Sequence, residues 1–137
     1  EGDILDLGEA DATDEARNTA VRVVWWRVSD LNGAIEVRNI RAWLEGASGE
    51  GGSIAWHMDI TDAWTRGKTP VQVETGTPGD APSAEGEPNL ARIGGGSITG
   101  SSHDQTSRYI YLSARIGVNA PPGKKSGIRL RIKYDFR

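Results

Sequence analysis

The chain has 137 residues, 19 acidic and 16 basic side chains, a formal net charge of −3 and a pI of about 5.4. This length suits one domain with a single core. It contains no cysteine, which excludes disulfides, thiol catalysis and cysteine-ligated metals. No apolar run approaches the length of a transmembrane helix, so no membrane span is expected.

The first twenty residues are expected to form an extended acidic arm, followed by one domain over residues 21–137. The first fifteen positions hold seven acids (Glu1, Asp3, Asp6, Glu9, Asp11, Asp14 and Glu15) and no base. Residues 2–8 read as a short strand or an extended segment. Ile4, Leu5 and Leu7 are its candidate apolar anchors.

Residues 21–28 are predicted to form a strand that ends in two adjacent tryptophans, Trp25 and Trp26. Successive side chains of a strand point to opposite faces, so one of the two needs cover from a loop or from another chain. This pair is the best sequence indication of an interface. The Asn32-Gly33 pair that follows predicts a turn with positive φ.

Alternating apolar side chains predict four more strands, at residues 35–44, 54–61, 107–118 and 128–137. In the last of these, apolar residues alternate with a face that is nearly all positive, including Arg129, Arg131 and Lys133. Residues 66–100 are rich in Gly and Pro and are expected to be irregular. Within them, only residues 71–73 and 90–93 are candidates for brief strand pairing.

Short strands between Gly/Pro turns, with no three-turn helical pattern, are typical of an antiparallel β-sandwich or jelly roll. The expected fold is therefore all-β, with an N-terminal arm and a long loop region at about residues 66–100. The opposite charges of the two ends allow two readings. They are solvated or mutually paired surfaces of one molecule, or they are complementary surfaces of neighbouring subunits.

The nearest approach to a catalytic or metal site is His57 with Asp59 and Asp62. In a strand His57 and Asp59 share a face, but a zinc site needs three or four ligands and the only other histidine is His103. The alternative is a solvent-facing polar strand edge. A calcium site drawn from acids such as Asp80 and Asp104 stays possible, without EF-hand spacing.

Two further motifs fail on spacing. Gly94-Gly95-Gly96 lacks the Gly-Lys-Ser/Thr ending of a phosphate-binding loop, and is expected to be a bend between strands. Ser101, Ser102, His103 and Asp104 are adjacent in sequence, but a catalytic triad is defined by geometry, and no nucleophile elbow surrounds a serine. No catalytic residue, metal or cofactor is therefore predicted.

The basic final strand could bind nucleic acid. The acidic pI argues against this interpretation, as does the lack of aromatic residues interleaved with basic ones. The five tryptophans are many for this length. They either fill a core short of Phe and Met, or form an interface or a sugar-stacking platform. Trp64, Tyr109 and Tyr111 are the candidates for such a platform.

The 119–123 turn, Asn-Ala-Pro-Pro-Gly, leads into an alternating C-terminal strand, and an extended arm lies at the other end of the chain. In these features the chain resembles, as a class, the β-sandwich subunits of virus coats and of donor-strand surface filaments. The resemblance implies a structural, non-catalytic protein outside cells, on the cell surface or in a virion. Its partners would be copies of itself, and other coat or surface proteins.

The leading hypothesis is self-assembly by arm or strand exchange. Its candidate interface residues are Ile4, Leu5, Leu7, Trp25, Trp26, Arg129, Arg131 and Lys133. The alternative is a carbohydrate-binding or adhesive module that uses the three platform aromatics. A hydrolase would require His57, Asp59 and His103 to converge.

Overall fold

The computed structural model describes residues 5–47, 53–100, 105–121 and 127–137. Its elements are β1 (Arg17–Asn18), β2 (Arg22–Val24), β3 (Val37–Glu45), β4 (Ile54–Thr61), α1 (Pro70–Glu74), β5 (Pro78–Asp80), β6 (Tyr109–Ile116) and β7 (Arg129–Phe136). All strand pairs are antiparallel, and the one helix in these ranges has five residues. The prediction of an all-β fold is confirmed.

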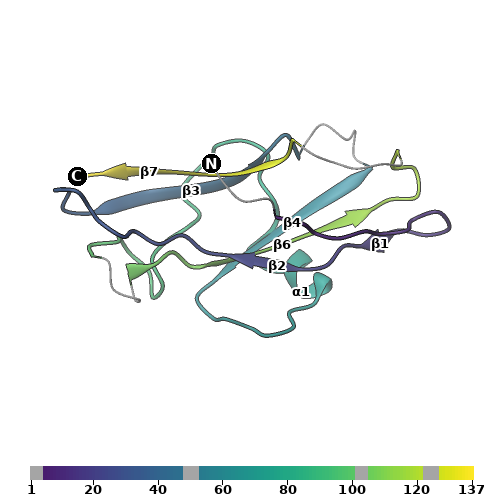
Figure 1. Cartoon of the computed structure of the whole chain (residues 1–137), viewed down its shortest axis with the longest axis horizontal. Helices are drawn as coiled ribbons and strands as arrows, with labels where there is room; N and C mark the ends of the chain where they lie inside the picture. Colours follow the sequence, from purple (N-terminus) through teal and green to yellow (C-terminus); the bar gives the residue numbers. More distant parts are fainter. Residues whose placement is uncertain (1–4, 48–52, 101–104, 122–126) are drawn as a thin grey trace.

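The strands form two sheets. In the larger sheet β1, β6, β4 and β5 lie in that order, and β2 also pairs with β6. The smaller sheet is the ribbon β3–β7. In Figure 1 the ribbon lies along one side of the larger sheet, and α1 lies on the other side.

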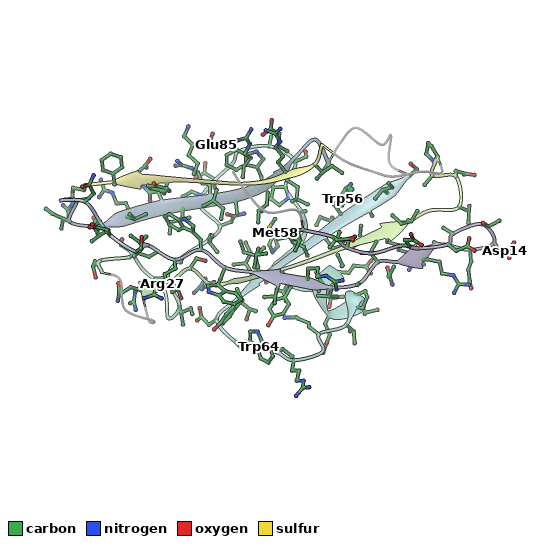
Figure 2. The ribbon with its side chains drawn as sticks, viewed as in Figure 1. Asp14, Arg27, Trp56, Met58, Trp64 and Glu85 are labelled. Carbon is green, nitrogen blue, oxygen red and sulfur yellow. The ribbon has the colours of Figure 1, made fainter. Side chains whose placement is uncertain are left out.

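The hydrophobic core lies between the two sheets. Met58 of β4, labelled in Figure 2, is fully buried among side chains from both of them. The core residues of the three long central strands are Ile40, Ala42 and Leu44 of β3, Met58 and Ile60 of β4, and Ile110 and Leu112 of β6. Their spacing is the alternation that predicted these strands.

A β-bulge explains why the apolar spacing of β3 is irregular. Val37 and Ile40 both face the core although they are three residues apart. The register shifts between Arg38 and Arg41, and Asn39 takes a positive φ of 53°. Because the bulge adds one residue to β3, the side chains of Ile40, Ala42 and Leu44 again point toward the core.

The second face of the larger sheet is covered by residues 62–79, which include α1. The α1 residue Val73 is fully buried there. Thr69 caps the helix, its hydroxyl accepting from the Gln72 N–H (3.3 Å) while the Gln72 side chain accepts from the Thr69 N–H (2.9 Å). The prediction of strand pairing at residues 71–73 is therefore wrong, and that at residues 90–93 is confirmed only as two isolated bridges.

The strand predicted at residues 21–28 is shorter than expected. Only β2 is regular, and Arg27 forms an isolated bridge with Thr106. The Asn32-Gly33 turn is confirmed, with positive φ at both residues and a bond from the Ala34 N–H to the Leu31 carbonyl (3.0 Å).

The described part of the N-terminal arm lies against its own molecule. β1 pairs with the end of β6, and the Ala20 N–H donates to the Leu7 carbonyl (3.1 Å). Ile4 lies outside the described residues. None of the helical residues described here forms a segment long and apolar enough to cross a membrane.

Candidate functional site

Among the described residues, the outer edge of β7 pairs with no other strand. Glu36 and Arg137 exchange main-chain bonds between β3 and the end of β7, at 3.2 and 3.0 Å. Because bonding direction alternates along an antiparallel strand, the odd-numbered residues of β7 bond to β3 and the even-numbered ones point outward. The outward N–H and C=O groups are those of Leu130, Ile132, Tyr134 and Phe136. Within the described ranges no segment pairs with them.

The opposite edge of the ribbon is closed, in contrast. The Asn89 side-chain amide accepts from the Ala42 N–H (2.8 Å) and donates to the Ala42 carbonyl (2.9 Å). Val37 and Ile98 exchange two main-chain bonds, and the Leu44 N–H donates to the Pro82 carbonyl. Residues 82–98 therefore complete β3, while β7 keeps an eight-residue open edge.

An exposed apolar tip lies where β3 begins and β7 ends. We define the apolar tip as Ile35, Tyr134 and Phe136, which are 66%, 41% and 72% exposed. Trp26 packs beneath it with its ring 4.8 Å from that of Tyr134. A surface cavity of about 360 Å³ between residues 26–32 and the ribbon includes Trp26, Tyr134 and Phe136 in its lining.

Basic side chains of β7, and Arg137 directly after it, form ion pairs with acids of β3 and of neighbouring segments. Arg131 pairs with Glu45, Lys133 with Glu85 (3.4 Å) and Arg137 with Glu36 (3.2 Å). The hydrogen bond from Arg131 lowers the pKa of Glu45. These pairs are exposed and contribute little to stability, so they leave the charge available to a partner.

Asp135 is the one acid on the charged face of β7. It accepts from the Asn39 amide (3.0 Å) and from Arg41 (3.4 Å). These contacts, Asn39 first, lower the pKa of Asp135. The interface candidates on β7 are all exposed, and they are Arg129, Arg131 and Lys133. Asp135 is the single acid that shares their face of the strand.

The two adjacent tryptophans have different environments. Trp26 packs against the core, whereas Trp25 is 52% exposed and contacts the Tyr109 ring edge-on, with centroids 5.6 Å apart. Trp64 is also exposed and, in Figure 2, projects away from the sheets on the α1 side. Tyr111 is only 2% exposed, so its prediction as a ligand-facing aromatic is wrong.

His57 and Asp59 are buried, so the expectation of a solvent-facing polar edge is wrong. Lys68 forms an ion pair with Asp59, and its ammonium lies 4.5 Å from the centre of the Tyr111 ring. The Asp59 carboxylate also accepts from the Thr77 N–H (3.0 Å). These contacts join residues 68–77 to the sheet and occupy Asp59.

Ser113, His57 and Asp80 form a row of direct cross-strand neighbours on β6, β4 and β5. The Nδ1 of His57 lies 3.5 Å from the Asp80 carboxylate, too misaligned for a hydrogen bond. The ring nitrogens of His57 and the hydroxyl of Ser113 have no hydrogen-bond partner within the described residues, and both side chains are buried. Both side chains lie on the face of the sheet that residues 62–79 cover.

The glycine triplet forms a turn, as expected, and its amide is already occupied. All three glycines have positive φ, and the Gly94 N–H donates to Asp62 (3.2 Å). Arg108 donates to the same carboxylate at 2.7 Å. The Arg108 bond and then the Gly94 N–H lower the pKa of Asp62. Asp62 is thus fixed as an anion inside this turn.

Among the described residues, no group of three or more His, Asp or Glu side chains is placed to hold a metal ion. Of the calcium candidates, Asp59 and Asp62 bind Lys68 and Arg108 instead. Ser101, Ser102, His103 and Asp104 lie outside the described residues.

No protein-family model, curated protein or solved structure matches this chain. The function is therefore argued from the surfaces described above.

Two features of these surfaces were not predicted from the sequence. The open edge of β7 depends on which strand pairs with which, and alternation does not encode pairing. The Ser113–His57–Asp80 row depends on register in the same way. The one available signal was the strong charge of the last strand, because charged side chains are common on exposed edge strands.

Proposed function

We propose that this chain is a structural, non-catalytic subunit that assembles with copies of itself. The two sheets with their shared core are taken as a β-sandwich, the architecture of the coat and filament subunits that the sequence resembles. A virion shell or decoration protein and an extracellular filament subunit are the two classes proposed. Other coat or surface proteins are further candidate partners.

The observation that carries this proposal is the open edge of β7 together with the apolar tip. Strand edges in monomeric proteins are usually short, covered or bulged, because an open edge pairs with other chains. β2 and β5 have only three residues each, but β7 has eight. The apolar tip adds contiguous side chains whose burial would stabilise a contact between copies.

A test is the mass of the purified chain in solution, by light scattering and negative-stain imaging, with and without residues 1–15. We expect the full chain to form particles or filaments well above 14.7 kDa. We expect the shortened chain to lose them while keeping its circular dichroism spectrum. A monomer in both forms, at concentrations up to about a millimolar, a range in which even weak contacts populate, would contradict the proposal.

The alternative function is a carbohydrate-binding or adhesive module. The observation that favours it is the exposed contact of Trp25 with Tyr109, with Trp64 as a third exposed aromatic. Aromatic faces stack on apolar faces of ligands. A monomeric chain whose tryptophan fluorescence changes on adding a saccharide, and whose Trp25→Ala variant loses that change, would support this alternative.

A further inference from the structure

We propose that the outer edge of β7 takes the N-terminal segment of a second copy, residues 5–15, so that copies join head to tail. Leu5-Asp6-Leu7 would form the added strand. This inference rests on the proposed self-assembly and names the two surfaces that carry it.

The first argument concerns side-chain pattern. In an added strand Leu5 and Leu7 share one face and Asp6 lies on the other. The apolar face of β7 presents Ile132 and Tyr134, and its charged face presents Arg131 and Lys133. A register that places the leucines beside the apolar face puts the Asp6 carboxylate beside the bases. One alternating pattern therefore satisfies both faces.

The second argument concerns net charge. Residues 5–15 contain five acids and no base. The charged face of β7 carries three bases and a single acid, Asp135, and Arg137 follows the strand directly. Opposite potentials favour the encounter and fix which segment docks.

The same charges oppose the simplest competing arrangement, in which β7 pairs with a second β7 about a two-fold axis. Such pairing brings the basic faces of both copies beside each other, and like charges opposite each other in a sheet are destabilising. The acidic segment has no such conflict. A heterologous contact is favoured over an isologous one.

The acidic loop of the segment and the C-terminal end of β7 lie at opposite ends of the molecule, whereas the described start of the segment lies nearer the middle. Asp14 lies at one end of the long axis in Figure 2, and the C-terminal end of β7 lies at the opposite end in Figure 1. Contacts of unlike surfaces repeat from copy to copy, and they give a ring if the rotation closes and an open filament if it does not. Reciprocal exchange of the two segments would instead close a two-fold dimer, and the mass of the assembly distinguishes that dimer from a ring or a filament.

Release of the segment from its own molecule requires few changes. Leu5 is 42% exposed, and Leu7 is held by the bond from the Ala20 N–H. Asp6 and Asp11 bond only to residues two positions along the same segment, Gly8 and Thr13. These local bonds move with the segment.

The test uses two full-length variants with changes at exposed positions. The donor variant carries Leu5→Lys and Glu9→Lys, which removes an anchor and reverses a charge on the arm. The acceptor variant carries Arg129→Glu and Phe136→Asn on β7. For each variant alone, the protein concentration needed for assembly should rise at least roughly tenfold. This factor corresponds to a loss of about 1.4 kcal/mol in contact free energy. An equimolar mixture should form 1:1 dimers and stop there, because the remaining arm and edge are both altered.

The matched controls place the same kinds of change elsewhere on the exposed surface. They are Glu74→Lys with Val118→Lys for the donor, and Arg66→Glu with Val71→Asn for the acceptor. Both controls should assemble like the unmodified chain, and near-ultraviolet circular dichroism checks that all four variants fold.

Three outcomes would overturn the inference. If the unmodified chain assembles and each variant alone assembles at the same protein concentration, the inference fails while self-assembly stands. If both variants are monomers and their mixture stays monomeric, the contact is not head to tail. If the unmodified chain is itself a monomer at all concentrations, the proposed function and the inference both fail.

Discussion

Gly76 illustrates how tightly residues 62–79 pack on the larger sheet. A Cβ built on Gly76 would lie 2.2 Å from the Cγ of Asp59, which is already bonded to Lys68 and to the Thr77 N–H. The carboxylate has no room to move without losing these partners. Glycine is required here by space and not by backbone angle.

We therefore expect Gly76→Ala to lower the free energy of unfolding by about 1–3 kcal/mol, the usual cost of overpacking. Urea unfolding followed by tryptophan fluorescence measures it. Gly86→Ala is the matched control, because its Cβ would meet no atom within 4 Å. The control should be neutral or more stable by up to about 1 kcal/mol, since alanine restricts the unfolded chain. Equal effects of the two changes would show that Asp59 is not held in place.

At the scale of the element, the outer edge of β3 is bonded by the side chain of Asn89 where a neighbouring strand would otherwise bond it. The Asn89 amide bonds both the N–H and the carbonyl of Ala42, as a main-chain partner would. The main chain of Asn89 and Leu90 bonds the Ile40 carbonyl beside it. This pairing closes one edge of the ribbon and leaves β7 as the open one.

We expect Asn89→Ala to cost about 2 kcal/mol or more, because it leaves two main-chain groups of a buried residue unpaired. Asn89→Asp should also be destabilising at neutral pH, because the carboxylate accepts from the Ala42 N–H but repels its carbonyl. Protonation lets the acid donate to that carbonyl, so the folded state holds this proton more tightly than the unfolded chain does. The deficit relative to the unmodified chain should therefore shrink as pH falls toward about 4, the usual pKa of an aspartate, and stay small below it. Asn119→Ala, an exposed change, is the control in urea unfolding. A pH-independent deficit for Asn89→Asp would contradict this role.

The long strands could be predicted from the sequence because each carries its own alternating pattern. β4, β6 and β7 lie within one or two residues of the predicted ranges. The local pattern misled at residues 71–73, where two valines two positions apart resemble a strand. The capping sequence that begins at Thr69-Pro70 was the stronger signal there, because it satisfies the first amides of a helix.

The polar face of β4 and β6 was misassigned for a non-local reason. His57, Asp59, Tyr111 and Ser113 alternate with core residues, which is typical of a solvent-facing side. Residues 62–79 fold over that face and bury it. Alternation gives the faces of a strand, but what covers each face depends on segments elsewhere in the chain.

At the scale of the whole molecule, the two ends differ in charge and in pairing. The apolar tip and the end of β7 lie at one end, and the acidic loop that contains Asp14 lies at the other. A subunit with unlike surfaces at its two ends is suited to repeated addition of further copies. The proposed assembly uses both surfaces and gives no part to the Ser113–His57–Asp80 row, in which Ser113 and His57 are buried and Asp80 is exposed.

The most direct test of this account is amide hydrogen exchange along β7, measured by NMR after exchange in the assembled and in the dissociated chain. The amides of Leu130, Ile132, Tyr134 and Phe136 point outward, and those of the odd-numbered residues bond to β3. We expect the odd-numbered amides to be protected in both states. The outward amides that the added strand covers, those of Ile132 and Tyr134, should become at least roughly tenfold slower only on assembly, as newly bonded amides do. Outward amides that exchange at the same rate in both states would show that the edge of β7 is not the surface through which copies join.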